Sequence, residues 1–146
     1  GVIPPEWRRP IGDHIYGCDI CAEVCPWNRF AQEAKSILLE ERSHIGRLSL
    51  REILSLTAET FAAVFKGTAV KRLKLRGLLR NACVVAANRN AVDLLPELMK
   101  LADHHEPLVR AHAVWAIRCL GGEEQLGSQR SREQDPIVLA EFETPL

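Results

Sequence analysis

The sequence LRNACVVAA, residues 79–87, aligns with VRAHAVWAI, residues 109–117, at an offset of 30 residues. Both stretches repeat small residues at the positions where neighbouring helices approach closely, and both lie among apolar residues at helical spacing. We therefore expect each stretch to form the buried part of a helix. These two helices decide the fold that the rest of the chain builds on.

Helix signals surround these two stretches. Ser49 followed by Glu52 forms a capping box and predicts a helix that runs to about Leu56. Thr57 is a suitable cap for a second helix, which carries an apolar stripe and ends at a glycine. Three further helices are predicted at about 68–88 with a bend near Gly77, at about 91–102, and from Pro107 to the pair Gly121-Gly122.

The helix that opens at Pro107 has a recognisable pattern. The run EPLVR, residues 106–110, is followed by Ala113, Ala116 and Leu120. It resembles the second half of a HEAT repeat, in which antiparallel helix pairs stack and bury a shared face. We therefore expect a mainly α fold, with a HEAT-like helical repeat domain over residues 49–122 whose first two helices act as a cap.

Composition is that of an ordinary soluble globular protein. The chain has 146 residues, of which 47% are hydrophobic and 26% charged, and its formal net charge is zero. No apolar run approaches the roughly 20 residues of a membrane span, so we expect no membrane contact. The clustering of the cysteines suggests metal chemistry in a reducing cytoplasm, and we expect a monomer. The first residues carry no initiator Met and no signal pattern, and they read as the middle of a longer protein.

Charge is distributed unevenly. The stretch 61–92 contains no acidic residue, whereas residues 123–146 read as a polar acidic tail. Arg72, Arg76 and Arg80 recur every four residues and would line one side of a helix, where they could follow an RNA backbone. The simpler alternative is a solvated helix face. The candidate RNA-binding residues are Lys66, Lys71, Arg72, Lys74, Arg76 and Arg80.

Residues 1–30 are rich in Pro and Gly and predict a module built from loops, followed by a linker at 31–48. Three of the five cysteines, Cys18, Cys21 and Cys25, lie within eight residues and are followed by Pro26. Soft thiolate ligands select iron–sulfur clusters or zinc, and the spacing with its final proline favours clusters. A zinc site completed by a histidine, or three unliganded thiols, are the alternatives. The histidines available to zinc are His14 and His44.

The cysteine run is incomplete beside the bacterial ferredoxin pattern C-x2-C-x2-C-x3-C-P, because Ile15 stands where the first cysteine belongs. By that pattern Cys18 and Cys21 would ligate one cluster and Cys25 a second. The remaining ligands would then precede Gly1. The two other cysteines, Cys83 and Cys119, lie among apolar residues and are expected to be small buried thiols.

The residues around the cysteines resemble the second cluster segment of epoxyqueuosine reductases. The likeness covers about residues 1–122. Its elements are IP at 3–4, RPIG at 9–12, IYGCDIC at 15–21, VCPWNRF at 24–30, FKGTA at 65–69, Arg72, RGLLRNA at 76–82 and PLVRAHAVWA at 107–116.

This resemblance implies a function for the whole protein, the reduction of epoxyqueuosine to queuosine at the wobble position of tRNA. It implies two 4Fe–4S clusters in a ferredoxin-like module, of which residues 1–30 would be half. It also implies an external electron donor, a HEAT-like domain that grips tRNA, and cobalamin held mainly by an N-terminal domain. The turn of Cys18 and Asp19 would face the corrin. The cobalamin domain is not in this sequence, so we expect the chain alone to be inactive.

Two other functions are compatible with the residues. One is a stand-alone electron carrier of ferredoxin type, and the other is a non-catalytic RNA-binding module with a zinc site. Smaller expectations concern single residues. Trp27 and Asn28 are expected to pack over the cluster, Asn81 to hold RNA or cap a neighbouring helix, and Trp115 to lie in the core. His104 and His105 are assigned to a helix junction and His112 to a polar helix face.

Overall fold

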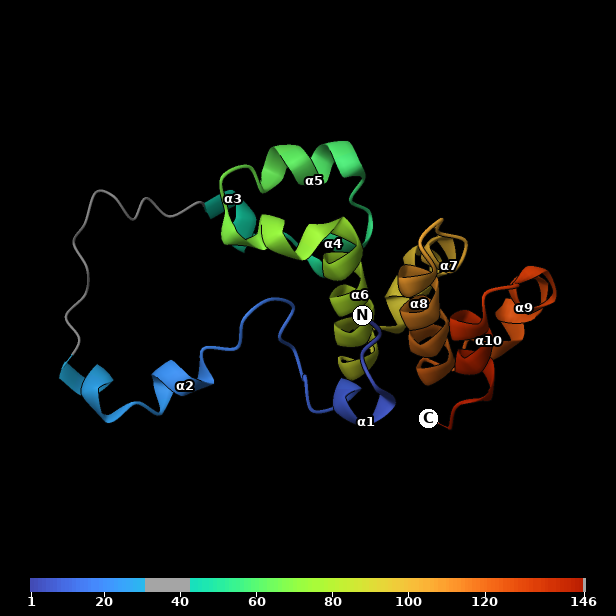
Figure 1. Ribbon diagram of the computed structural model, residues 1–146, viewed down its shortest axis with the longest axis horizontal. Coiled ribbons are helices and arrows are strands. Elements are labelled where there is room, and N and C mark those ends of the chain that lie inside the picture. Colours follow the sequence, from blue (N-terminus) through green and yellow to red (C-terminus); the bar gives the residue numbers. More distant parts are fainter. Residues whose placement is uncertain (31–42, 146) are drawn as a thin grey trace.

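A computed structural model of the chain describes residues 1–30 and 43–145 (Figure 1). The predicted linker at 31–48 therefore falls mostly outside the described residues, as does the side chain of His44. The described residues are mainly helical and contain no β-strand. No helix among them is both long and apolar enough to cross a lipid bilayer.

The helical elements follow one another in this order, with η marking 3₁₀ helices. They are α1 (Pro5–Arg8), α2 (Ile20–Glu23), η1 (Pro26–Phe30), α3 (Ser43–Gly46), α4 (Leu50–Leu54), α5 (Ala58–Val64), η3 (Ala69–Leu73), α6 (Lys74–Asn88), η4 (Val92–Leu94), α7 (Leu95–Ala102), α8 (Pro107–Cys119), η5 (Glu123–Leu126), α9 (Gly127–Arg132) and α10 (Pro136–Glu143).

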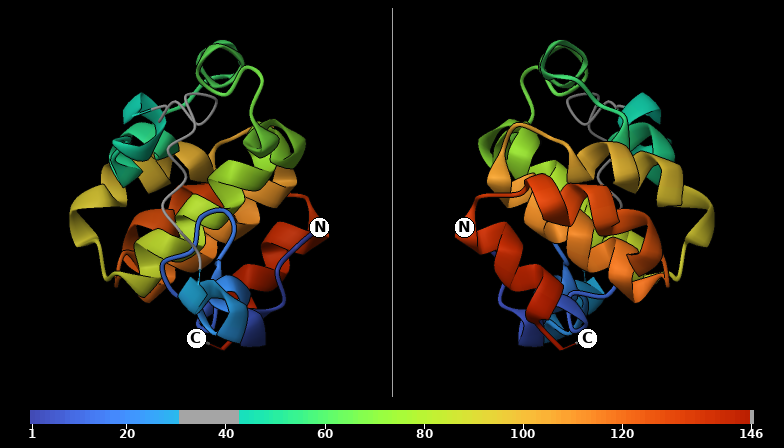
Figure 2. Two further views of the ribbon diagram at one scale, coloured as in Figure 1. Left: turned by 90° about the vertical axis from the view of Figure 1, so that its left-hand side faces the viewer. Right: turned by 90° about the vertical axis from the view of Figure 1, so that its right-hand side faces the viewer.

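Helix α8 lies at the centre of the helical part and packs against α6, α7 and α10 (Figures 1 and 2). The two stretches that align at an offset of 30 residues meet in this core. Residues 82–87 of α6 and 111–117 of α8 are all buried, as expected. Their alanines allow the two helices to approach closely, and Trp115 fills the remaining space as a core residue with 3% exposure.

The predicted capping box at Ser49 and the predicted cap at Thr57 are both present, and Thr57 also forms a capping box. The Ser49 hydroxyl accepts the Glu52 amide at 3.2 Å, and the Glu52 carboxylate accepts the Ser49 amide at 2.7 Å. Thr57 and Thr60 make the same reciprocal pair at the start of α5. These bonds satisfy backbone donors that would otherwise lack partners in helices as short as α4 and α5.

The predicted helix over 68–88 is instead two elements. Lys74 adopts a left-handed φ of +61° and separates η3 from α6, so the chain changes direction there and not near Gly77. Gly77 lies inside the continuous α6. A Cβ atom at this position would stand 2.9 Å from the side chain of Leu73, so the glycine makes room for Leu73 and does not bend the helix.

The acidic segment 123–146 does not behave as a tail apart from the fold. It forms η5, α9 and α10, and α10 packs directly on α8. Leu126, Val138 and Phe142 are buried in the same core as α6 and α8. Val138 and Phe142 are four residues apart and so share one helix face, a weak apolar signal among many charges.

Candidate metal-ligating loop and basic surface

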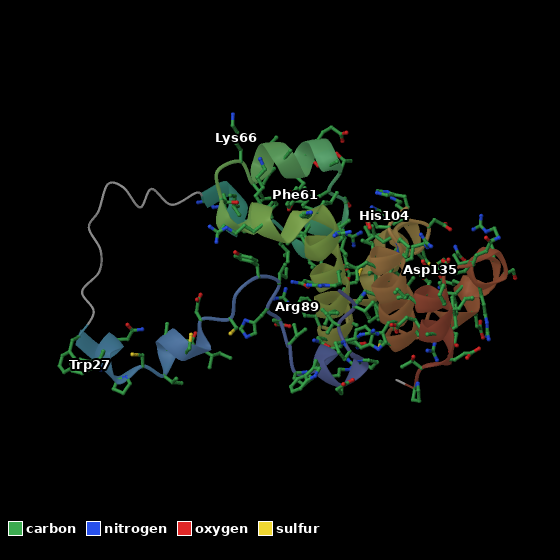
Figure 3. The ribbon with its side chains drawn as sticks, viewed as in Figure 1. Trp27, Phe61, Lys66, Arg89, His104 and Asp135 are labelled. Carbon is green, nitrogen blue, oxygen red and sulfur yellow. The ribbon has the colours of Figure 1, made fainter. Side chains whose placement is uncertain are left out.

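The three clustered cysteines lie on residues 18–30, the cysteine segment, which extends away from the helices (Figures 1 and 3). Cys18 and Cys21 are exposed and Cys25 is partly exposed. Gly17 and Asp19, on either side of Cys18, both have left-handed backbones, with φ of +67° and +49°. The chain therefore turns sharply at Cys18 before α2 begins, and the Asp19 side chain makes no capping hydrogen bond to α2.

Local hydrogen bonds give the cysteine segment its shape. The Cys25 amide donates to the Ala22 carbonyl at 3.2 Å, and the Asn28 amide donates to the Cys25 carbonyl at 3.0 Å. The side chain of Asn28 also donates to the Ala22 carbonyl and so ties η1 to α2. Trp27 is 79% exposed and lies apart from the helical part (Figure 3). Its expected packing over a cluster stays a prediction.

The donor chemistry of this segment suits a thiophilic metal centre. All five cysteines are free thiols. Within residues 1–30 and 43–145, no three His, Cys, Asp or Glu side chains form a group that could hold a metal ion. Burial raises the pKa of the thiols of Cys83 and Cys119, so these two are poor thiolate donors. Cys18, Cys21 and Cys25 are thus the accessible sulfur ligands of the described residues.

Residues 1–17, which we call the N-terminal strap, contact the helices and lead into the cysteine segment. The Asn81 side chain on α6 donates to the Ile15 carbonyl at 2.7 Å. About two turns further along α6, the Asn88 side chain donates to the carbonyls of Arg8 and Gly12, both at 2.9 Å. Asn81 therefore positions the loop before Cys18. Neither of the roles expected for it, RNA contact or helix capping, describes this contact.

His112 anchors the beginning of the strap. Its Nε2 accepts the Ile3 amide at 3.1 Å while Nδ1 lies 2.8 Å from the Leu108 carbonyl, so the neutral ring with a proton on Nδ1 satisfies both contacts. Burial lowers the pKa of His112 from 6.5 to about 3. His112 is completely buried, so its assignment to a polar helix face is wrong. The strap, which covers it, lies 109 residues away in sequence.

The basic residues do not form the single stripe that their spacing predicts. Arg72 belongs to η3, whereas Arg76 and Arg80 belong to α6 beyond the turn at Lys74. Arg76 lies 3.5 Å from the Glu106 carboxylate. Arg80 is partly buried, which lowers its pKa, and it donates to the Gly1 carbonyl at 2.7 Å and to Asn81 at 2.9 Å.

The remaining basic candidates are exposed. Lys71 and Arg72 lie on η3, Lys74 forms the turn into α6, and Lys66 follows α5 and points outward (Figure 3). The structure thus separates the six predicted residues into exposed cations around the turn and the inward-facing Arg80, which belongs to the strap contacts.

A cleft of about 630 Å³ connects the strap, the cysteine segment and α6. Its walls include Trp7, Ile11, Tyr16 and Cys18 from the first twenty residues, together with Arg80 and Asn81 from α6. Cys18, the first cysteine of the run, therefore lines the same cleft as residues of α6. Sequence reasoning did not identify this cleft, because its walls come from segments more than 60 residues apart.

No family model matches the chain. Among curated proteins, it is 38% identical to the epoxyqueuosine reductase of Staphylococcus aureus over 126 residues, which is 85% of this chain and 33% of the relative. It is 32% identical to the epoxyqueuosine reductase of Escherichia coli over 117 residues, or 80% of this chain and 31% of the relative. The chain thus spans about a third of the length of these relatives.

Solved structures agree with the sequence comparison. A crystal structure of epoxyqueuosine reductase with an epoxyqueuosine-modified tRNA-Tyr stem loop matches with a TM-score of 0.90 and 28% identity, covering 98% of this chain and 39% of that one. The epoxyqueuosine reductase of Streptococcus thermophilus matches with a TM-score of 0.82 and 30% identity, again over 98% of this chain and 39% of that one. In sequence and in fold, this chain is a relative of the epoxyqueuosine reductases that corresponds to one segment of their length.

Proposed function

We propose that this chain is the cluster-ligating and tRNA-docking part of an epoxyqueuosine reductase, an oxidoreductase that reduces epoxyqueuosine to queuosine at the tRNA wobble position. One observation carries the proposal. Three accessible thiols belong to one C-x2-C-x3-C-P run, in a chain whose relatives, by sequence and structure, are epoxyqueuosine reductases.

The cysteines supply ligands to two 4Fe–4S clusters. Cys18 and Cys21 serve one cluster and Cys25 the other, with the missing ligands coming from the part of the relatives that this chain does not cover. The accessible thiols and the sharp turn at Cys18 fit this role. Asp19, in that turn, is the residue we expect to face cobalamin, which an N-terminal domain would mainly hold. The clusters would relay single electrons from an external donor, and cobalamin would supply the reductive chemistry.

The exposed cations near the turn at Lys74 dock tRNA through its phosphates, on a helical domain of HEAT-like type. Lys71, Arg72 and Lys74 are exposed, and no acidic residue interrupts the sequence around them. Lys66 and Arg76 extend the same surface. Arg80 contributes indirectly, because its guanidinium is engaged by the strap. A relative has been crystallised with a tRNA stem loop, which supports an RNA partner.

Turnover by the full-length protein tests the activity. The protein, prepared without oxygen and supplied with cobalamin and a reductant, should convert epoxyqueuosine in a tRNA stem loop to queuosine. Conversion is measured by mass spectrometry of the digested RNA. Failure of the fully loaded protein to convert this substrate would refute the enzyme assignment.

Binding tests the docking surface separately. Replacing Arg72 and Lys74 together by alanine should weaken stem-loop binding, and each phosphate that the variant no longer binds should lower the slope of log affinity against log salt by about 1. Arg132→Ala is the matched control, because Arg132 is an exposed arginine on α9 that pairs with Asp103. Equal slopes of log affinity against log salt in the double variant and the control would contradict the proposed docking surface.

A further inference from the structure

One buried ion pair joins the two ends of the described chain. Arg8, at the end of α1, is completely buried, and Glu141 on α10 is 4% exposed. The two terminal nitrogens of Arg8 each donate to one carboxylate oxygen of Glu141 at 2.6 Å. The third donor group, Nε, donates to the Ile3 carbonyl at 2.8 Å. The guanidinium therefore binds helix α10 and the strap at the same time.

The helical side of this pair is itself firmly held. Arg118 on α8 donates to the backbone carbonyls of Glu141 and Thr144, at 2.5 and 2.8 Å. The Arg8 guanidinium also lies over the ring of Trp115 on α8, 5.1 Å from its centroid. Glu141 is thus a fixed point on the core against which the strap is located.

Further hydrogen bonds hold the strap between Arg8 and the cysteines. After Arg8, the carbonyls of Gly12 and Ile15 accept hydrogen bonds from Asn88 and Asn81. Cys18 follows Ile15 by three residues. The strap therefore links the C-terminal helix to the metal-ligating loop through a continuous series of contacts.

We propose that Glu141 and Arg8 are positioning residues that set the place of the Cys18 loop relative to the helical part. The acidic segment 123–146 then has a structural role, because α10 supplies the carboxylate that fixes the strap. The chemical meaning of the inference rests on the proposed function, in which the distance from the loop to the rest of the enzyme governs electron delivery. The positioning itself is a property of this chain.

Hydrogen exchange on the chain tests the first step. Removing one partner of a buried ion pair leaves the other charge unpaired, which is strongly destabilising. We expect Glu141→Gln to speed exchange of the Ile3 amide by about 100-fold. Glu143→Gln, an exposed neighbour on α10, should leave that rate unchanged. Amides of α6 serve as an internal measure of global unfolding and should change far less than Ile3.

A spin-label distance tests the second step, the place of the loop. Cys18 is labelled together with a Ser55→Cys substitution near the end of α4, after Cys21, Cys25 and Cys119 are replaced by serine. Cys83 is fully buried and stays unlabelled. The account predicts that Glu141→Gln broadens the distance distribution between the two labels, whereas Glu143→Gln does not.

An anchor on another helix provides an independent variant. Asn88→Ala removes the hydrogen bonds to Arg8 and Gly12, and it should also broaden the Cys18 distance without touching α10. Unchanged distances in both folded variants would overturn the inference. This result is separate from the proposed function, because broadened distances in a protein whose full-length form binds no iron would sustain the positioning and refute the cluster assignment.

Discussion

The helical part buries its apolar residues, whereas the cysteine segment exposes them. Ile117 in α8 and Leu79 in α6 have no exposed surface, whereas Ile20, Val24 and Trp27 are 50%, 72% and 79% exposed. Burial of apolar surface therefore stabilises the helices. The cysteine segment depends on local backbone hydrogen bonds and, under the proposed function, on metal ligation. The two regions should respond differently to the same substitution.

The largest difference is expected for one residue type placed in the two regions. Ile117→Ala should lower the free energy of unfolding by about 2–5 kcal/mol, because it leaves a cavity in a packed core. Ile20→Ala, its match on α2, should change that free energy by less than about 0.5 kcal/mol. Chemical denaturation followed by helical circular dichroism measures both. Similar decreases in the two variants would mean that the cysteine segment is part of the cooperative core.

The contact between His112 and the strap should give stability a pH dependence. The pKa of His112 is about 3 in the folded chain and 6.5 when unperturbed. Between these values the unfolded chain binds more protons, so stability is complete above about pH 6.5 and falls as the pH decreases. The expected decrease for His112 is about 2 kcal/mol between pH 7 and pH 5.

A variant isolates this effect. His112→Gln should show a smaller decrease of stability over the same pH range, and His105→Gln, at an exposed position, should behave like the unchanged chain. His104, whose pKa is lowered mainly by burial and also by the neighbouring His105, is present in all three proteins. Identical pH slopes for His112→Gln and the unchanged chain would show that the ring is not held neutral by the strap.

The smallest expected difference concerns helix starts. Ser49→Ala removes the side-chain half of the capping box of α4 and should cost about 1 kcal/mol. Asp19 precedes α2 without a capping bond and at a left-handed φ that suits glycine. Asp19→Gly should therefore leave stability unchanged within about 0.5 kcal/mol. Thermal unfolding of the two variants measures the contrast, and an equal effect at both sites would contradict it.

Patterns over a few residues of the sequence predict the features that depend on interactions between near neighbours in the chain. The capping residues Ser49 and Thr57 and the buried stretches 82–87 and 111–117 are predicted correctly, because each depends on spacings of a few residues. The turn at Lys74 is not predicted, since a left-handed lysine has no sequence signal comparable to a glycine. That turn is also why three arginines at helical spacing do not share a helix.

Contacts between distant segments could not be read from the sequence. Arg8 and Glu141 lie 133 residues apart, and each looks like an ordinary surface charge in its own neighbourhood. His112 likewise becomes a buried acceptor only when the strap covers it. The cysteines could be singled out from the sequence, because ligand chemistry depends on residue type and short spacing, and their role as cluster ligands stays a prediction.

Iron analysis of the full-length protein, purified without oxygen, tests the central claim most directly. The account predicts about eight iron atoms per chain, a decrease by about half in Cys25→Ser, and removal of nearly all iron when Cys18 and Cys25 are both replaced by serine. Cys83→Ser, which removes a buried thiol, should retain all of the iron. An iron content that stays the same when Cys18 and Cys25 are replaced, or zinc in place of iron, would contradict the proposed cluster ligation.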